Sequence, residues 1–459
     1  MMSHLIPNLS REKIKQMLKY IGVKRIDDLF KDIPEEIRFK GKLRISGPFS
    51  EQDIAKRFSE RLSHVIDPSK ILCFRGGGVW PHYVPSVIDH IISRSELYTS
   101  YTPYQPEVSQ GVLQALFEYQ SLICELTGMD VANASMYDWA TALAEACRMA
   151  IRVTRRDKIV IPSIIAPHRE RVLRTYLEGL EIEIVKVNLN KNGTVDISKL
   201  SENVDSKTAA VYVESPTYMG VIEQNLDEIG EIAHKNGALF IVGVEPLSLA
   251  IFKPPGDYGA DIVVGEGQPL GLGMNFGGSL LGIFACRFDR KLLYQMPGRI
   301  IGLTTEQDSA RRAFCMVLQA REQHIRRERA TSNICTNVAL NAIKAAIYLS
   351  LLGRNGLRNV AKKIYANTHY AYRKLLELPF TESLFKDAVY FKEFPIMFKE
   401  VDIEEMNRVL YDDFNIIGGI NLGRFFEDMA NVALFCVTEI HSKRDIDYLA
   451  KAILEACEK

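Results

Sequence analysis

The chain has 459 residues, which is too long for one modest domain, so two unequal domains are the first expectation. Hydrophobic residues make up 47% of the chain and charged residues 25%, as in ordinary soluble globular proteins. Lys plus Arg and Asp plus Glu both number 57, so the net charge is zero. The chain therefore has no basic bias that would favour nucleic-acid binding and no acidic tail that would favour a basic partner.

The sequence also predicts a cytoplasmic protein without a membrane segment. The first residues are polar and helical in character and do not resemble a signal peptide. The most apolar stretch, residues 238–252, is interrupted by Glu245 and Pro246 and therefore predicts a core strand and not a membrane span. The eight cysteines are scattered, with no Cys-x-x-Cys pair, which favours buried reduced thiols and no metal site.

Residues 1–60 are predicted to form a helical arm. Ile14, Met17 and Leu18 recur at helix spacing until Gly22 ends the run. Ser50, followed by Asp53, has the pattern of a capped helix start. Such an arm can either wrap a neighbouring subunit or pack on the surface of its own chain.

Residues 61–330 are predicted to form a large α/β domain. From Lys158 to Val264, short strands that are apolar along their whole length alternate with helices. This pattern predicts a mostly parallel sheet that is covered on both faces. After Asn337 a long helical run with Gly353 and Gly356 is followed by short strands and helices, which predicts a smaller α+β domain over residues 331–459.

A glycine-rich segment precedes this series. Residues 74–85 contain three consecutive glycines followed by Trp80, His82 and Tyr83, but not the spacing of a phosphate-binding loop. His82 is interpreted as a structural residue or as a cleft residue, and the sequence leaves both open.

Residues 101–107 (YTPYQPE) form an unusual polar heptapeptide. Two prolines stiffen it, and its polar side chains are those of Tyr101, Tyr104, Gln105 and Glu107. It is either a rigid surface loop or a loop that directs these phenols, amide and carboxylate into a shared cleft, because stiff loops position polar groups at little entropic cost.

Residues 133–138 (NASMYD) lead into a strong helix former. Small and polar residues at a helix start can hold a phosphate on free N–H groups, or they can simply cap the helix. Trp139 argues against a phosphate or cofactor ring here, because its indole would fill the space.

Residues 259–286 have the strand, tight turn, glycine-rich loop and strand of a pyridoxal-phosphate (PLP) enzyme. A lysine in that turn should hold the cofactor as a Schiff base, but residues 254–290 contain no lysine. Gln268 lies near the expected position, and an amide cannot form a Schiff base. Glu245 follows a strand where an acid would pair with the pyridinium nitrogen, although a carboxylate hydrogen-bonded in a buried turn is the favoured interpretation.

Three separated segments, residues 98–146, 264–271 (VGEGQPLG) and 330–336 (ATSNICT), together resemble glycine decarboxylase, the P-protein of the glycine cleavage system. The resemblance is to the amino-terminal half, which in some bacteria and archaea is a separate first (alpha) subunit, and it covers essentially the whole chain. Trp139 departs from the small residue expected in the family, which indicates a filled, unused pocket.

This resemblance implies the fold of fold-type I PLP-dependent transferases, which is aminotransferase-like. It implies a second (beta) subunit that carries the lysine and PLP, an α2β2 heterotetramer, and transfer of the aminomethyl group of glycine to the lipoyl arm of H-protein. This chain would complete the partner's site across the interface. The residues that we expect to contribute are Tyr101, Tyr104, Gln105 and Glu107 near substrate, and Arg329, Thr331, Ser332 and Asn333 near the phosphate of PLP.

Two other hypotheses remain at this point. The chain could be a complete PLP enzyme that uses a lysine elsewhere, or a non-catalytic scaffold that only stabilises the second subunit. Thr331, Ser332 and Asn333 could equally cap the helix that follows them.

Overall fold

The computed structural model describes residues 9–67, 70–100, 102–334 and 337–458. The chain divides into two units, Met1–Ile66 and Asp67–Lys459, each of which has its own internal contacts. Tyr101, one of the predicted site residues, lies outside the described residues, as does Cys335.

The first unit consists of short helices joined by extended segments. Helix α1 (Arg11–Ile21) begins where Ser10 accepts a hydrogen bond from the Lys13 N–H, and it ends at Gly22, whose φ is +86°. A 3-10 turn, η1 (Ile26–Phe30), and helix α2 (Glu51–Leu62) follow. Ser50 accepts from the Asp53 N–H, which confirms the predicted cap. Within the described part of this unit, no residue of these three elements is buried.

The second unit is built on a mixed sheet. Within the described residues its seven strands lie in the order β2-β8-β7-β6-β5-β3-β4. The pairs from β4 to β7 are parallel, whereas β8 runs antiparallel to β7 and to β2. This confirms the predicted mostly parallel sheet. The strands are β2 (Val131–Ala132), β3 (Lys158–Pro162), β4 (Glu183–Val187), β5 (Thr208–Ser215), β6 (Leu239–Val244), β7 (Ile262–Glu266) and β8 (Gly282–Cys286).

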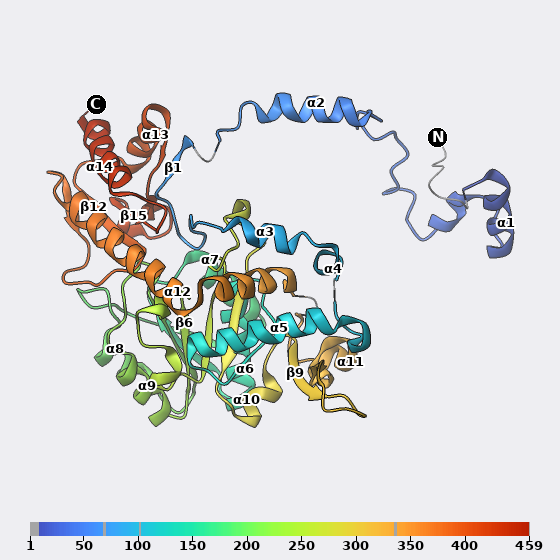
Figure 1. The fold of residues 1–459 in the computed structure, drawn as a ribbon, viewed down its shortest axis with the longest axis horizontal. Coiled ribbons are helices and arrows are strands. Elements are labelled where there is room, and N and C mark those ends of the chain that lie inside the picture. The colour runs from blue at the N-terminus through green and yellow to red at the C-terminus, as the bar shows by residue number, and fades with distance from the viewer. Residues whose placement is uncertain (1–8, 68–69, 101, 335–336, 459) are drawn as a thin grey trace. The chain divides into compact units, whose positions relative to one another are not determined.

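Helices cover both faces of this sheet, which is why its central strands are apolar along their length. Along β6, Phe240 and Val242 pack into the cluster formed with α5, α9 and α12, whereas Ile241 packs into the cluster formed with α6, α7 and α10. Figure 1 shows α5 and α12 crossing the same face. These helices are α5 (Pro106–Thr127), α6 (Trp139–Thr154), α7 (Pro167–Leu177), α9 (Leu226–Lys235), α10 (Arg290–Gln295) and α12 (Ala339–Leu376). The second unit also contains three shorter helices, α3 (Ser86–Ile92), α4 (Ser95–Tyr98) and α8 (Ile197–Asn203).

The carboxy-terminal part has a core of its own. Its antiparallel sheet has the order β11-β12-β15-β14 and packs with α13 and α14. Strand β1 (Leu72–Cys73) pairs in parallel with β13, so residues near position 72 also belong to this region. The elements are β11 (Thr381–Ser383), β12 (Glu393–Phe398), α13 (Ile403–Phe414), β13 (Ile416–Ile417), β14 (Ile420–Asn421), β15 (Val432–Cys436) and α14 (Lys443–Glu458).

Two elements differ from the sequence-based expectation. Helix α5 begins at Pro106, because proline fits the first turn of a helix, so Glu107 is helical and does not belong to a fully extended loop. A hairpin of β9 (Ile300–Thr305) and β10 (Arg312–Val317) was not predicted. Its outer half holds the exposed Leu303, Thr304, Thr305 and Arg312, so apolar and polar residues do not alternate there.

The seven described cysteines are free thiols. Burial was predicted for them, and it is found for Cys147, Cys286 and Cys436, whereas Cys73, Cys124, Cys315 and Cys457 are only partly buried. None of the helices in the described residues combines the length and the apolar character that a membrane span requires.

Candidate active site

Three carboxylates are buried where the central strands end. Glu214 lies in β5, Glu245 directly follows β6, and Glu266 is the last residue of β7. Each side chain belongs to a residue that is at most 2% exposed. Because carboxyl ends of parallel strands meet at one edge of a sheet, this is the edge where open α/β folds bind ligands. Buried carboxylates must be paired or hydrogen-bonded, and their partners define the site.

Trp139 and Arg169 fill the space above β6. A Cβ on Gly243 would lie 2.7 Å from Cζ2 of Trp139, so the indole needs a glycine on the strand below it. Cζ of Arg169 lies over the Trp139 ring, 3.4 Å from its centroid, and Nη1 of Arg169 lies 2.8 Å from Oε1 of Glu214. The indole N–H donates to the Tyr212 hydroxyl at 3.1 Å, which donates to Glu214 at 2.7 Å. The indole is therefore held by the guanidinium over its ring, by the hydrogen bond of its N–H and by the strand beside it.

The amino terminus of α6 is occupied by carboxylates of the same chain. Asp138 caps the helix by accepting from the Thr141 N–H at 2.8 Å, which confirms the capping interpretation for this residue. Glu266 accepts from the Trp139 N–H at 3.2 Å and from two further backbone N–H groups. Burial nevertheless raises the pKa of Glu266 to about 8. The Ser135 hydroxyl accepts from the Val338 N–H at 3.2 Å.

Gln268 occupies the turn after β7, near the position expected for the lysine. Its Oε1 accepts from the Trp80 N–H at 3.1 Å, and its Nε2 donates to the Trp80 and Gly273 carbonyls at 3.0 and 2.8 Å. The residue is fully buried. The amide thus joins the glycine-rich segment 74–85 to the turn, and both of its donor hydrogens are used.

Lys392 supplies a positive charge beside Glu245. Its Nζ lies 2.9 Å from Oε1 of Glu245 and 3.7 Å from the centroid of the Trp80 ring, so an ion pair and a cation–π contact hold the same ammonium. Glu245 also accepts from the Ser248 N–H at 2.9 Å. Glu245 is therefore a hydrogen-bonded carboxylate in a buried turn, as the favoured sequence interpretation predicted.

His82 extends this network. Its Nε2 lies 3.2 Å from Nζ of Lys392, and its Nδ1 lies 2.8 Å from Oε2 of Glu439. Burial alone would raise the pKa of Glu439, but His82 and the Tyr83 N–H lower it to about 2. His82 thus lies within the buried network, between two charged groups.

These residues do not fit PLP. The cofactor needs an amine for the Schiff base, space for a flat ring and free N–H groups for its phosphate. The turn instead holds Gln268, whose amide donors are already used, the indole of Trp139 is buried beside Gly243 of β6, and Glu266 and Asp138 accept from the Trp139 and Thr141 N–H groups of α6.

The predicted heptapeptide lies beside a separate cluster of charged residues. The hydroxyl of Tyr104 accepts from Nη2 of Arg299 at 2.7 Å, and the guanidinium lies 4.9 Å from the phenol ring centroid. Nε of Arg299 lies 3.6 Å from Oε2 of Glu322. Gln105 and Glu107 are exposed at the start of α5.

The second predicted segment, residues 329–333, is divided between surface and interior. Arg329 is exposed beside Glu328, and Asn333 is also exposed. The Thr331 hydroxyl donates to the Arg321 carbonyl at 3.4 Å. The Ser332 hydroxyl donates to Oε1 of Glu145 at 2.7 Å, and burial raises the pKa of Glu145.

The structure therefore connects Tyr104 and Thr331 to one short segment, residues 321–324, through Arg299 and Arg321. Arg299, Glu322 and Lys392 were not identified from the sequence. Each is a single charged residue without a local motif, and each pairs with a residue far away in the chain.

Comparison with known proteins agrees with this architecture. The model of the glycine cleavage system P-protein family matches residues 2–453. A probable glycine dehydrogenase (decarboxylating) subunit 1 from Staphylothermus marinus is 52% identical over 462 residues, covering 98% of this chain and 97% of the relative. The protein of the same name from Sulfurisphaera tokodaii is 48% identical over 453 residues, covering 98% of each.

A solved structure of glycine decarboxylase (P-protein) in inhibitor-bound form is 39% identical, with a TM-score of 0.86 over 97% of this chain and 98% of that chain. A NifS-like protein from Rickettsia africae has a TM-score of 0.62 over 85% of this chain and 100% of its own, and its 14% identity shows the fold alone. The predicted fold-type I architecture is confirmed. The chain belongs to the glycine cleavage system P-protein family.

Proposed function

We propose that this chain is the first subunit of a two-chain glycine decarboxylase, that is, a glycine dehydrogenase (aminomethyl-transferring). Its relatives carry the name subunit 1, which supports a second, similar chain as the partner. In the proposed complex glycine loses CO₂, and the aminomethyl group passes to the lipoyl arm of H-protein.

The observation that carries this proposal is the filled site of this chain. Gln268 has no amine, and the buried indole of Trp139 takes up space that a cofactor ring would need. A decarboxylase of this fold therefore needs its lysine and PLP from the second subunit. This chain's part is to bind that subunit and to contribute side chains across the interface.

The heptapeptide is the part of this chain that we assign to the shared site. Tyr104, Gln105 and Glu107, together with Tyr101, would line the glycine pocket or the lipoyl channel. Tyr98 and Val108 flank this segment and are 70% and 79% exposed. A partner bound over this segment would bury both side chains.

Arg329 and Asn333 are exposed and have side chains suited to an anion, so we assign them to the phosphate of PLP held by the partner. Thr331 and Ser332 belong to the same proposed group. Ser332, however, already donates to Glu145 within this chain. That hydrogen bond favours the second candidate function, a scaffold that stabilises the partner without contacting its cofactor.

The N-terminal unit supports an assembly of several chains. In α2, Ile54, Phe58 and Leu62 recur every fourth residue and are 43–61% exposed. Such a stripe on one helix face needs a covering surface. We propose that the second subunit provides it within an α2β2 heterotetramer.

Reconstitution with the second subunit tests the function. Tyr104→Phe and Asn333→Ala should each lower glycine decarboxylation with lipoylated H-protein by about tenfold, as expected when a hydrogen-bonding group is lost at an active site. Tyr411→Phe, at a tyrosine that is also about half exposed, is the matched control and should leave turnover unchanged. Unchanged turnover in all variants, with assembly intact, would contradict the shared site and support the scaffold.

A further inference from the structure

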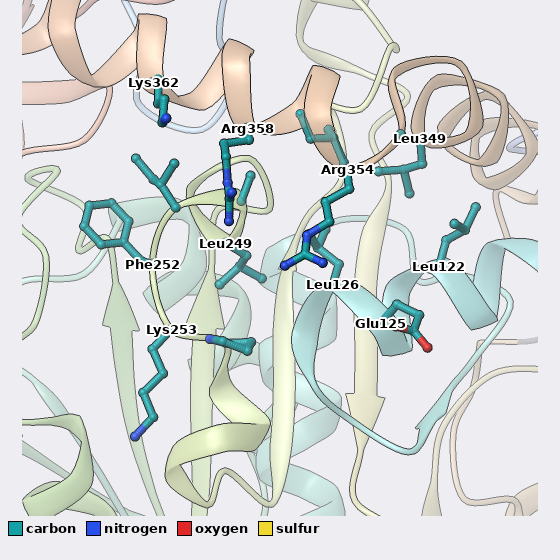
Figure 2. Close-up of a pocket in the computed structure, with 15 residues that line it drawn as sticks. Leu122, Glu125, Leu126, Leu249, Phe252, Lys253, Leu349, Arg354, Arg358 and Lys362 are labelled. Atoms are coloured by element: carbon teal, nitrogen blue, oxygen red, sulfur yellow. The ribbon is translucent and has the colours of Figure 1, made fainter.

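A cleft of about 900 Å³ lies between α5, the loop 249–254 and α12. Figure 2 shows its lining residues. The loop and both helices belong to the cluster on the face of the sheet opposite α6, so the cleft is separate from Trp139 and its neighbours. The apolar lining is provided mainly by leucines: Leu122, Leu126, Leu249, Leu349 and Leu357.

One rim of the cleft is positively charged. Arg354, Arg358 and Lys362 lie on α12 at intervals of four residues, which places them on one face of the helix. In Figure 2 the guanidinium groups of Arg354 and Arg358 extend from α12 toward the loop that contains Leu249.

These cations are not neutralised by the described part of the chain. No ion pair or side-chain hydrogen bond of Arg354, Arg358 or Lys362 occurs among the described residues, whereas exposed Arg408 and Arg424 each pair with a glutamate. Glu125 is the one carboxylate among the lining residues of the cleft. Lys253, also in the lining, pairs with Asp227 at 3.0 Å.

A break in helix α12 at Gly353 positions the charged rim. Gly353 has φ +56° and ψ −174°, a conformation that is essentially restricted to glycine, and it interrupts the helix just before Arg354. The second half of α12 therefore starts at the cleft, and its positive end adds to the charge of the arginines.

We propose that this cleft binds a small organic anion with an apolar body. A carboxylate or phosphate group would be held by Arg354 and Arg358, because the planar guanidinium matches the oxygens of both groups. The apolar body would lie on the leucines. The volume is within the range of sites for small organic ligands, which is roughly 300–1,000 Å³.

Calorimetric titration of the full-length chain, alone and in complex with the second subunit, tests this proposal. The probes are octanoate, octyl phosphate and the uncharged octanamide. Arg354→Gln/Arg358→Gln removes two charges from the rim while keeping good helix formers. Arg171→Gln/Lys363→Gln removes two exposed charges from α7 and from α12 outside the cleft, and it serves as the matched control.

We expect one or both anions to bind the unmodified chain and the control variant with equal affinity, and this affinity should fall at high salt. The affinity of the rim variant should be about tenfold lower, which corresponds to about 1.4 kcal/mol. The tighter anion identifies the group as carboxylate or phosphate. The proposal would be overturned if neither anion bound, or if the chain bound octanamide as tightly as the anions. It would also be overturned if the rim variant bound the anions as tightly as the unmodified chain, or if binding disappeared in the complex with the second subunit.

Discussion

Lys392 and Glu245 form an ion pair that is closed to solvent, with a distance of 2.9 Å and with side chains that are 1% and 2% exposed. The ammonium also contacts the Trp80 ring and lies close to His82. The carboxylate that follows β6 is thus compensated by a cation of the same chain. This relationship explains how the sheet edge can be closed without an external ligand.

Replacing Lys392 with an uncharged residue should strongly lower the free energy of unfolding. Lys392→Met leaves Glu245 buried without a counter-charge, and the expected loss is about 3–5 kcal/mol in the free energy of unfolding. Urea denaturation measures this loss.

The control is Lys399→Met, which breaks an exposed pair with Glu382 and should cost less than about 1 kcal/mol. The double variant Lys392→Met/Glu245→Leu removes both charges and should recover most of the loss. A stability of Lys392→Met equal to that of Lys399→Met would show that the pair contributes nothing.

A lysine placed at position 268 should not turn this chain into a PLP enzyme. Gln268→Lys loses the acceptor for the Trp80 N–H and buries an ammonium among groups arranged for an amide. We expect a lower melting temperature and no visible absorption band from bound PLP. A stoichiometric absorption band in the isolated variant would show that the site still has space for the cofactor.

The stability of the chain should depend on pH through Glu266. Burial raises its pKa from the ordinary value of 4.5 to about 8, so the folded state binds this proton more tightly than the unfolded chain. The contribution of this protonation to the free energy of unfolding is complete below pH 4.5 and is lost as the pH rises to about 8. Over this range the free energy of unfolding falls by up to about 1.4 kcal/mol per pH unit.

Urea denaturation between pH 5 and pH 8 checks this dependence. Glu266→Gln cannot titrate, so the slope of its unfolding free energy against pH should be more positive than that of the unmodified chain by about this amount. Identical slopes would mean that Glu266 is ionised throughout.

The apolar stripe of α2 should be needed for assembly and not for folding. Ile54→Ser/Phe58→Ser removes side chains that would each contribute about 1.5–3 kcal/mol when buried, so the affinity for the second subunit should fall by about 100-fold or more. Sedimentation equilibrium measures the affinity.

Gln52→Ser/Lys56→Ser, on the polar side of the same helix, is the control. The unfolding midpoint of the isolated chain should stay the same in both variants. If the stripe instead packs on its own chain, the midpoint would fall and the affinity would not change.

The sheet was predictable because its signals are local. Buried parallel strands such as β6 are continuous apolar runs, and Gly22 and Ser50 mark helix ends by their own chemistry. The hairpin of β9 and β10 was not predicted, although residues 313–318 also form an apolar run. Its place is set by packing on α5, where Gln110 bonds both backbone groups of Phe314.

The candidate site was predictable only in part. The missing lysine and the bulky Trp139 are visible in the sequence, and the structure shows Trp139 buried against β6. The residues that pair with these groups could not be predicted. Lys392 is 147 positions away from Glu245, and no motif links Glu322 to Arg299. Such pairs depend on the packing of the whole fold.

Borohydride reduction of the two-chain complex loaded with PLP, followed by peptide mapping, shows which subunit holds the cofactor. The cofactor should be fixed to a lysine of the second subunit, and no lysine of this chain should be labelled. A labelled lysine in this chain, with PLP retained by the isolated chain, would contradict the account.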